Sequence, residues 1–502
     1  MTPAPAFPKP SLLVALALGT MIAMMTAACA GVKAPAPPAG GGDASGGAGG
    51  GARPPSGTGV GGTGVTVPPT GNGACTNLRC RQGSCTGAGC MATACPGGGT
   101  TSLSGTVTDP AGRVPLYNVV VYVPNEPVQP LPSGAACETC GGNFSGKPIA
   151  VTLTDTAGHF KLDDVPIGAN VPVVIQIGKW RRQLVMDNVP ACANTPIANA
   201  DLTRLPRNKS EGDIPKFAIA TGGSDALECL LRDIGVDEAE FTSDTGAGRV
   251  HLFQGYRASP TIATNGASTP LTPVDQLWSS TASMMRYDIV LMACEGDSGQ
   301  SEGRTAAQYQ AVRGYGDMGG RIFGSHYHTN WVRSEDGEPN AGYPMVVKFS
   351  EGEGTLPDGF LSTVDTSFPK GMAFRDWLVN VGATPTPGQL AVIGTKHLVD
   401  ATVPGVSQQW LYGMDTAKKT PAVQYFSFTA PVGQKECGRM IFSDVHVAQG
   451  GGDLAAVPFP TRCGPAGGDL SPQEKALEFM LFDISSCVQK DDAPVQPPTI
   501  IP

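Results

Sequence analysis

The chain has 502 residues, with 34 Lys and Arg against 43 Asp and Glu, and a formal net charge of -9 at pH 7. This length is too great for one compact core and predicts two or three folded units. The negative charge argues against a nucleic-acid partner, because the chain has no strongly basic field to neutralise phosphates.

The N-terminus has the pattern of an export signal. Lys9 precedes an apolar stretch from Leu12 to Met25, and small residues follow as far as Ala30. This stretch is shorter than the ~20 residues that cross a bilayer comfortably, so it favours a cleaved signal peptide over a permanent transmembrane helix. We therefore assign residues 1–28 as a signal peptide.

The motif Thr26-Ala27-Ala28-Cys29 resembles the lipobox of bacterial lipoproteins, in which the cysteine is acylated and becomes the new N-terminus. Thr26 departs from that pattern, which usually has Leu at this position. Cleavage by ordinary signal peptidase after Ala28 or Ala30 is the alternative and would leave a secreted protein. Because Ala30 is not Asp, the resemblance favours the outer membrane. We expect a lipoprotein of the cell envelope, palmitoylated at Cys29 and attached to the outer membrane.

The segment 29–74 is predicted to be a stalk. From Gly31 to Gly73 it is almost wholly Gly, Pro, Ala, Ser, Thr and Val, a composition that cannot bury a core. Gly-rich stretches behave as flexible coil and prolines stiffen them locally, so this length can hold a folded body clear of a membrane.

A Cys-rich segment, 75–100, follows the stalk. Its cysteines recur every five residues, at Cys75, Cys80, Cys85, Cys90 and Cys95. Oxidation is favoured in an exported chain, whereas a zinc site lacks paired C-x-x-C knuckles and a nearby His, so we predict disulfides. Five is an odd number, so one partner lies elsewhere, and Cys137, Cys140 and Cys192 are the nearest candidates.

Residues 101–206 are predicted to form an all-β sandwich. Short runs rich in β-branched residues alternate with tight turns, and the expected strands are 102–108, 118–123, 149–154, 159–162 and 171–177. The motifs Ser104–Asp109 and Asp155–Phe160 resemble the carboxypeptidase regulatory-like (transthyretin-like) family. That resemblance implies a seven-stranded sandwich that serves as a spacer or binding accessory without catalytic residues. Trp180–Arg182 is interpreted as the end of the last strand, with solvated arginines.

Residues 207–490 are predicted to alternate strands and helices around a mainly parallel sheet, followed by a disordered tail, 491–502. The expected strands are 216–221, 249–254 and 288–293, and the expected helices are 224–233, 274–285, 306–315 and 472–485. The turn Thr221–Ser224 matches neither the dinucleotide-binding nor the P-loop glycine pattern, so we expect no cofactor.

Three segments of this region carry a second resemblance: Tyr287–Gly296, Gly319–His326 and Cys437–His446. They resemble the trehalose-utilisation (ThuA-like) branch of the class I glutamine amidotransferase-like superfamily, over about 214–487 with an insertion around 332–390. The resemblance implies an α/β flavodoxin-like parallel sheet. The whole arrangement is also similar to poorly characterised lipoproteins of Gram-negative bacteria.

The resemblance implies a nucleophile on a sharp strand-to-helix turn, and Cys294 occupies such a place. His326 would act as its base and Glu295 as an orienting or acid-base group. Glutamine amidotransferases carry G-x-C-x-G and a His-x-Glu pair, but Met292 replaces the first glycine here and no such pair follows.

Histidines and an aspartate offer a second candidate site. His326 with His328, and Asp444 with His446, are each two residues apart on an expected strand and would point to one face. These four side chains could bind a divalent metal ion, with Glu295 as a further oxygen ligand. Alternatively, such histidines hydrogen-bond to loop backbone.

The remaining cysteines bear on the nucleophile. We expect Cys437 to pair with Cys463 and Cys229 with Cys487, which leaves Cys294 free. Alternatively, Cys294 pairs with one of these or is buried as a small apolar residue.

Two functions are consistent with these patterns. The first is an envelope lipoprotein whose sandwich and degenerate amidotransferase-like domain bind a glycan or a protein. The second is an envelope hydrolase that uses Cys294 as nucleophile or a His/Asp metal site.

The lipobox predicts that growth with radiolabelled palmitate labels the protein and that Cys29→Ala abolishes the label. A thioether-linked lipid would also keep the wild-type chain in the membrane fraction. An unlabelled, soluble mature chain beginning at Ala30 or Gly31 would instead identify a secreted protein.

Overall fold

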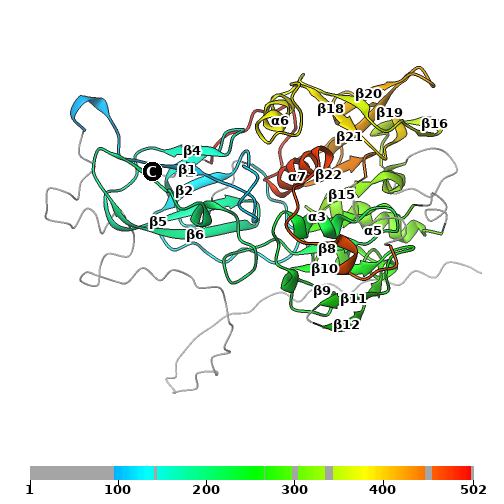
Figure 1. Ribbon diagram of the computed structural model, residues 1–502, viewed down its shortest axis with the longest axis horizontal. Helices are drawn as coiled ribbons and strands as arrows, with labels where there is room; N and C mark the ends of the chain where they lie inside the picture. The colour runs from blue at the N-terminus through cyan, green and yellow to red at the C-terminus, as the bar shows by residue number, and fades with distance from the viewer. Residues whose placement is uncertain are drawn as a thin grey trace, which may run out of the picture. The chain divides into compact units, whose positions relative to one another are not determined.

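The computed structural model describes residues 78, 95–140, 144–264, 266–296, 303–333, 343–446 and 455–498, all of them within the compact unit Val60–Pro502. The signal peptide, the stalk, the lipidation residue Cys29, and Cys75, Cys80, Cys85 and Cys90 lie outside these ranges. Within them the fold is rich in β-structure (Figure 1). No helix in this part of the chain is long and apolar enough to cross a membrane.

Seven strands near the N-terminal end form two sheets, with orders β4-β1-β7 and β3-β2-β5-β6. Their bounds are β1 Ser102–Thr106, β2 Val120–Pro124, β3 Pro148–Leu153, β4 His159–Leu162, β5 Gly168–Ile177, β6 Trp180–Val189 and β7 Asn194–Pro196. All five strands expected from the sequence are present. The two sheets enclose a core of buried aliphatic side chains that includes Leu103, Val121 and Val173.

The interpretation of Trp180–Arg182 as a strand end is wrong, because Trp180 begins β6. Gly178 and Lys179 form a two-residue hairpin turn, and Ile177 pairs with Trp180 across it. The Trp180 indole is fully buried, and Arg181 is buried in an ion pair with Asp213 rather than solvated. The polar run Arg181–Gln183 concealed this strand, because it has no alternation of polar and apolar residues and Arg181 is paired inside the protein.

A mixed eleven-stranded sheet forms the second part of the structure, with order β13-β10-β8-β14-β15-β22-β21-β20-β17-β18 and with β9 beside β10. The strands from β13 to β22 along this order are parallel, and the rest are antiparallel. The parallel strands are β8 Phe217–Ala220, β9 Phe241–Ser243, β10 Val250–Gln254, β13 Thr272–Pro273, β14 Ile289–Met292, β15 Arg321–Ser325 and β22 Gly438–Ser443. The prediction of a mainly parallel sheet is therefore correct for the part from β13 to β22 and wrong for the part from β21 to β18.

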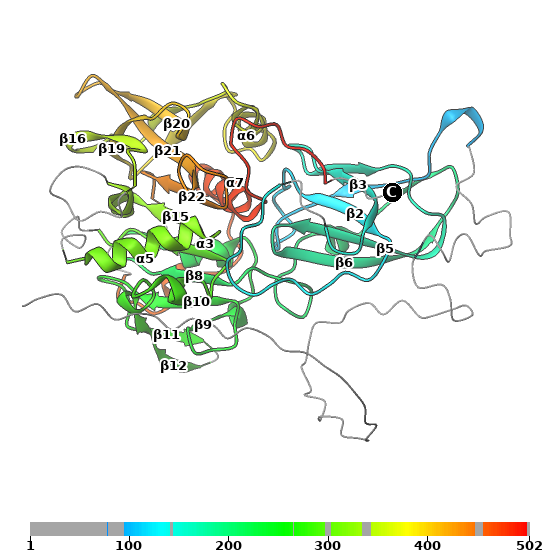
Figure 2. The same ribbon diagram turned by 180° about the vertical axis from the view of Figure 1, so that it is seen from behind.

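Helices cover both faces of the parallel half. They are α3 Leu227–Asp233, α4 Thr281–Met284, α5 Ala306–Asp317 and α7 Pro472–Ser485. Alternate residues of β14 belong to different cores: Ile289 and Leu291 pack with α3 and α7, whereas Val290 and Met292 pack with α5. Figures 1 and 2, which are opposite views, show α7 and α5 on opposite sides of the sheet.

Capping motifs define where the two long helices of this part begin. Thr305 and Gln308 form a capping box at α5, and Ser471 and Glu474 form another at α7. The single helix expected over 274–285 is wrong. A 3₁₀ turn, Val274–Gln276, is followed by the separate helix α4, which is capped by Ser280.

The insertion between β15 and β22 is longer than expected, with its elements between 347 and 430. It contains β16 Val347–Thr355, β17 Phe360–Val364, α6 Pro369–Asn380, β18 Gln389–Val392, β19 Lys396–Thr402, β20 Ser407–Asp415 and β21 Thr420–Ala430. Four of these strands extend the main sheet, while β16 and β19 pair with each other. The strands β20 and β21 are joined by a short hairpin connection, whereas helix α6 lies in the connection between the antiparallel neighbours β17 and β18.

Disulfides join the sandwich to the mixed sheet. Four pairs lie among the described residues: Cys95–Cys192, Cys137–Cys437, Cys140–Cys487 and Cys229–Cys463. The expected partner of the Cys-rich segment is confirmed as Cys192. The expected pairs Cys437–Cys463 and Cys229–Cys487 are wrong, because two of these cysteines bond instead to the segment that links β2 and β3.

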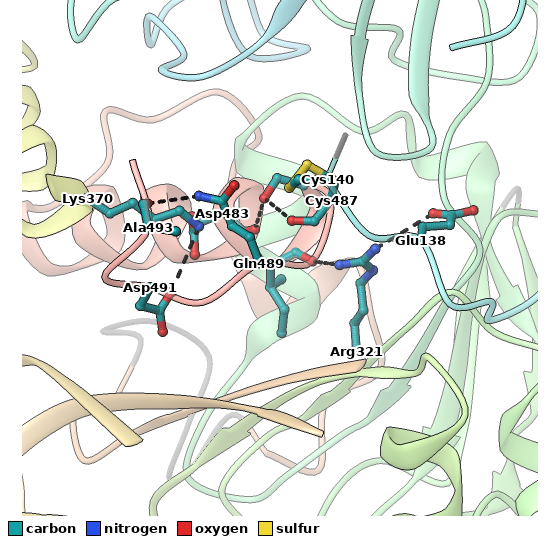
Figure 3. The surroundings of a disulfide bond; sticks show 11 residues. Glu138, Cys140, Arg321, Lys370, Asp483, Cys487, Gln489, Asp491 and Ala493 are labelled. Carbon is teal, nitrogen blue, oxygen red and sulfur yellow. Dashed lines mark hydrogen bonds and ion pairs between the residues drawn. A yellow bond between two sulfur atoms is a disulfide. The ribbon is translucent and has the colours of Figure 1, made fainter. Parts of the chain in front are cut away.

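Figure 3 shows the surroundings of the Cys140–Cys487 disulfide at the end of α7. Backbone hydrogen bonds join Cys140 N to Val488 O at 3.0 Å and Val488 N to Glu138 O at 2.8 Å. The carboxylate of Glu138 in turn lies 3.7 Å from the buried guanidinium of Arg321 on β15. Covalent, hydrogen-bonded and ionic contacts therefore hold this segment against the sheet.

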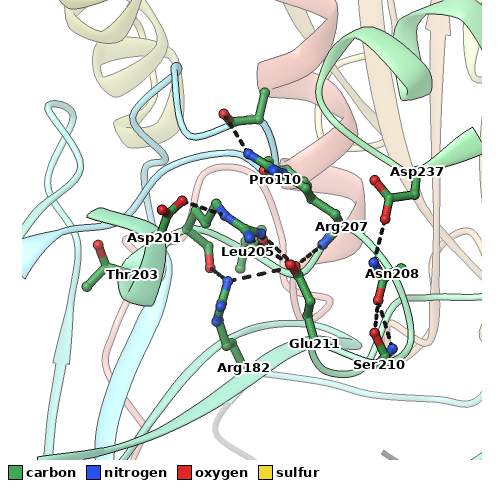
Figure 4. A network of polar contacts seen from close by, with 12 residues as sticks. Pro110, Arg182, Asp201, Thr203, Leu205, Arg207, Asn208, Ser210, Glu211 and Asp237 are labelled. Carbon is green, nitrogen blue, oxygen red and sulfur yellow. Dashed lines mark hydrogen bonds and ion pairs between the residues drawn. The ribbon is translucent and has the colours of Figure 1, made fainter. Parts of the chain in front are cut away.

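The link between sandwich and sheet is fastened by an arginine-rich network (Figure 4). Arg204 forms a bidentate pair with Glu211, at 2.6 and 2.7 Å. Hydrogen bonds from Arg204 hold the pKa of Glu211 down at about 2, since they stabilise the carboxylate. Arg207 donates to Pro110 O at 2.9 Å, so the link contacts a sandwich loop directly.

The expected disordered tail begins instead with an ordered residue. Asp491 is buried and lies 2.6 Å from the guanidinium of Arg439 on β22, which also contacts Asp483 at 2.6 Å. A buried arginine needs such partners because an unpaired charge inside a protein is costly. The ion pair therefore holds the start of the tail in place.

Two buried carboxyl groups face each other between the sandwich and α7. Asp109, in the loop after β1, accepts hydrogen bonds from the backbone of Arg113 and Val114. Glu478 on α7 is fully buried, and neither of its oxygens has a partner among the described residues. Burial raises the pKa of Asp109 to about 6 and the pKa of Glu478 well above its usual range.

We expect the wild-type chain to lose folding stability as the pH rises from 4 to 7. The substitution Asp109→Asn should reduce this loss. Well below pH 4 the aspartate is protonated in both states. As the pH rises, the unfolded chain loses its proton first, so the wild-type fold loses stability, by roughly 2–3 kcal/mol, until about pH 6. Asparagine keeps the acceptor oxygen without the charge.

Urea unfolding with intact disulfides, at several pH values, measures this difference. The exposed Asp187→Asn on β6 serves as the control and should follow the wild type. Parallel pH profiles of Asp109→Asn and wild type would contradict the role of Asp109.

Candidate functional site

The carboxyl ends of three neighbouring parallel strands form the candidate site. β14 pairs with β15, and β15 with β22, so that Met292 lies opposite Gly324 and Ser325 opposite Ser443. Cys294, His326 and His446 follow the ends of these three strands. The carboxyl edge of a parallel sheet is the usual ligand-binding edge in open α/β folds.

Cys294, His326 and His446 converge at this edge. One donor atom from each side chain lies within 4.8 Å of the donor atoms of the other two. The imidazole rings of His326 and His446 stack with centroids 3.5 Å apart and an angle of 24° between their planes. Cys294 and His326 are fully buried and His446 is half-buried, so His446 is the member nearest to solvent.

His326 has an unusual backbone conformation and a defined tautomer. Its φ of +47° is in the left-handed region, which costs free energy for a residue other than glycine. Its Nε2 lies 2.7 Å from the carbonyl oxygen of Asp444, which can only accept, so Nε2 carries the proton. The other nitrogen, Nδ1, is therefore a free acceptor, and it has no hydrogen-bond partner among the described residues. Burial lowers the pKa of His326 well below its usual value.

Cys294 is a free, buried thiol in this part of the chain. Burial raises its pKa to about 12, while the backbone N–H groups of Gly296 and Tyr327 act in the opposite direction. The glycine turn after β8 packs on its backbone: a Cβ on Gly222 would lie 2.2 Å from the carbonyl oxygen of Cys294. Only glycine allows this approach, so the turn that matched no phosphate motif supports the cysteine instead.

Glu295 is held in a buried ion pair. Its carboxylate lies 3.2 Å from Arg304 and accepts a hydrogen bond from Tyr256 N at 3.1 Å. The Arg304 guanidinium lies over the rings of Trp331 and Trp278, 4.3 and 5.6 Å from their centroids. Glu295 is thus held by structural contacts, and sequence reasoning missed Arg304, which carries no motif.

His328 and Asp444 are also placed by structural contacts. The expected strand ends at Ser325, and His326–Val332 forms a 3₁₀ turn, so His326 and His328 do not share a strand face. His328 donates from Nε2 to Ala293 O at 3.0 Å and accepts from the Trp331 indole at 3.1 Å. One carboxylate oxygen of Asp444 accepts from Leu398 N at 2.9 Å.

The structure therefore brings together members of both predicted sites. Cys294 and His326 come from the expected catalytic set and His446 from the expected metal set, while Glu295, His328 and Asp444 have other contacts. The shared signal in the sequence was position: each member lies within three residues of the end of a strand of the parallel sheet. A thiol and two imidazoles at this spacing can exchange protons or bind a soft metal ion.

Comparisons with known proteins add little to this geometry. No protein-family model matches the chain, and no curated protein matches it. Two solved structures are similar over short parts: a C-terminal and an N-terminal interface mutant of a type II Cohesin-X-Dockerin complex from Acetivibrio cellulolyticus. The C-terminal mutant is 18% identical, covers 29% of this chain and 78% of its own, and has a TM-score of 0.14. The N-terminal mutant is 16% identical, covers 27% of this chain and 85% of its own, and has a TM-score of 0.15.

Burial predicts that Cys294 of the folded chain reacts slowly with iodoacetamide, even at pH 8.5, because both access and thiolate formation are suppressed. Unfolding in urea with disulfides intact should expose it to rapid labelling, measured by peptide mass spectrometry. Cys294→Ser removes the labelled peptide and serves as the control. Fast labelling of the folded chain near pH 7 would contradict the buried, high-pKa thiol.

Proposed function

We propose that this chain is an outer-membrane lipoprotein of the cell envelope, held by a lipid on Cys29 and a stalk, which displays a folded glycan-binding body. The observation that carries the binding function is a cavity of about 390 Å³ on the sandwich. Its volume is within the range of small-ligand sites in proteins. The stalk favours display, because a long Gly/Pro-rich segment extends the body away from the membrane.

The lining of this cavity suits a sugar. Apolar side chains of the four-stranded sheet form part of it, including Val120 on β2 and Leu153 on β3, and the aromatic ring of Phe144 adds a flat apolar surface. Polar groups converge around them from different parts of the chain: Asn118, Gln129, Glu138, Ser145, Gln176 and Gln496. Amides and hydroxyls both donate and accept hydrogen bonds, as sugar hydroxyl groups require.

The strand order supports the expected class of the second part. Numbered along the chain, β8, β10, β14, β15 and β22 lie in the order 2-1-3-4-5 across the parallel half of the sheet, which is the flavodoxin-like order. We propose on this basis, and on the motifs after β14 and β15, a degenerate class I glutamine amidotransferase-like fold carrying a long antiparallel insertion. The seven-stranded sandwich supports the carboxypeptidase regulatory-like assignment in the same way.

The alternative function, an envelope hydrolase with Cys294 as nucleophile, has weaker geometric support. The sulfur is fully buried, and Glu295 is paired with Arg304 instead of orienting a histidine. A nucleophile must be reachable by substrate as well as close to its base.

Binding of the folded chain to muropeptides and N-acetylglucosamine oligomers, measured by isothermal titration calorimetry, tests the proposal. We expect saturable binding that Phe144→Ala weakens about tenfold or more and Gln129→Ala weakens less, through lost contact with the sugar face and hydroxyls. Leu361→Ala on β17, at a residue that is 53% exposed and outside the cavity lining, should bind as wild type.

Absence of saturable binding to either probe would overturn the glycan proposal. Equal affinities of Phe144→Ala and wild type would show that any glycan binds elsewhere. Capture of a protein partner that Phe144→Ala abolishes would assign the cavity to a peptide instead.

A further inference from the structure

The cluster of Cys294, His326 and His446 has the donor arrangement of a metal site. Its three residues follow the ends of three adjacent strands, and one donor atom from each lies within 4.8 Å of the others. Tetrahedral zinc with a sulfur and two nitrogen ligands needs donors about 3.4–3.6 Å apart, given metal–ligand bonds of about 2.0–2.3 Å. The rings of His326 and His446 are stacked with an angle of 24° between their planes, so one ring, that of the half-buried His446, must rotate before both nitrogen lone pairs point to one ion.

Each of the two histidines has one buried ring nitrogen without a protein partner in the described part of the chain. His326 Nδ1 and His446 Nε2 have no hydrogen-bond partner among the described residues. Other buried polar atoms of the described residues also lack partners, so these two nitrogens gain meaning only from the free thiol in the same cluster, with which they can serve a ligand. The contrast with His328 is informative, because both of its ring nitrogens are bonded to protein groups.

The surroundings already orient His326 for coordination. Donation from its Nε2 to the Asp444 carbonyl leaves the Nδ1 lone pair directed elsewhere, as is usual for a histidine that binds metal. The same carbonyl oxygen accepts hydrogen bonds from Thr395 and from the backbone of Lys396, so its position is fixed. The left-handed backbone at His326 is an independent sign, because strained residues persist where surrounding contacts and function hold them.

We propose that Cys294, His326 and His446 bind one late first-row transition metal ion, with Zn²⁺ as the preferred ion. Cysteine sulfur and imidazole nitrogen are the donors that zinc prefers, and three protein ligands leave a fourth position open. The half-buried His446 provides the route by which the ion enters. Formation of the metal–sulfur bond releases the thiol proton to solvent. This site is separate from the cavity on the sandwich, so the inference does not rest on the proposed glycan binding.

Metal binding to the full folded chain, without a histidine tag and after removal of metal with EDTA, tests this site. After dialysis against Zn²⁺, elemental analysis should show one more zinc ion per chain in the wild type than in Cys294→Ser. This difference excludes ions bound by cysteines of the 75–95 segment. With Co²⁺ as a spectroscopic probe, a thiolate-to-cobalt charge-transfer band should form and then disappear as Zn²⁺ displaces the cobalt.

Three variants locate the ligands. Cys294→Ser should lose the charge-transfer band, and His446→Ala should bind Co²⁺ at least about tenfold more weakly. His159→Ala, at an exposed histidine on β4, is the matched control and should bind as wild type. If Cys294→Ser does not fold, His446→Ala still tests the site. Zn²⁺ should raise the melting temperature of the wild type but not that of His446→Ala.

Either of two results would overturn the proposal: no stoichiometric metal on the wild-type chain, or equal binding by wild type and His446→Ala. The same set of one sulfur and two imidazoles also suits Cu²⁺. Competition between Cu²⁺ and Zn²⁺, followed by the visible thiolate-to-copper band, distinguishes the two ions at this site.

Discussion

Parallel hydrogen bonding between β14, β15 and β22 is the constraint on which the candidate site depends. The register of these strands brings their carboxyl ends to one edge, so residues 294, 326 and 446 meet although more than 100 residues separate the last two. β15 has no freedom to shift, because its neighbours bond to it on both sides. Strand register is strongly specified when both faces are buried, since a one-residue slip would move every side chain to the opposite core.

The sandwich and the sheet are held together by contacts of several kinds. A continuous buried cluster runs from Leu103 in the sandwich to Leu477 on α7. Lys179, in the turn before β6, is buried in an ion pair with Asp288, immediately before β14, at 2.6 Å. These contacts, with two disulfides, order the segment 129–140 across the cavity. The geometry of the cavity is therefore a property of both parts and not of the sandwich alone.

Buried polar groups around Arg304 and Arg439 are arranged differently from those in the cluster of Cys294, His326 and His446. Around Arg439 and Arg304 each guanidinium has carboxylate partners, which is the usual way to tolerate a buried charge. At Cys294, His326 and His446 the groups are neutral when buried, and two nitrogens lack partners. Some polar atoms of Arg304 and Arg439 also lack hydrogen-bond partners among the described residues, so the two arrangements differ in charge. Carboxylates neutralise the guanidinium groups, whereas the cluster consists of neutral groups that can donate electron pairs to a ligand.

Local patterns in the sequence determined most elements of the fold. The buried strand β14 is apolar at every position from Ile289 to Met292, and the closing helix 472–485 carries Ser471, Pro472 and Glu474 at its start, so both could be located without tertiary information. Strand β6 was not predicted from the sequence, because Arg181 pairs inside the protein with Asp213. This partner is 32 residues away, and no local pattern reveals it. Within the insertion, β20 and β21 form a local hairpin, but β16 pairs with the distant β19, which no local pattern reveals.

The sequence also determined which residues stand at strand ends, and so it contained every member of the cluster. Tertiary structure alone decided how they group: Glu295 turns to Arg304, His328 to Ala293 and Trp331, and Cys294 meets both His326 and His446. Tertiary structure also decided the disulfide pairing. Cys437 pairs with Cys137, and Cys487 pairs with Cys140, both partners lying outside the sheet. Residue type and spacing define what a side chain can bind, but its partner depends on which segments the folded chain brings within a few ångströms.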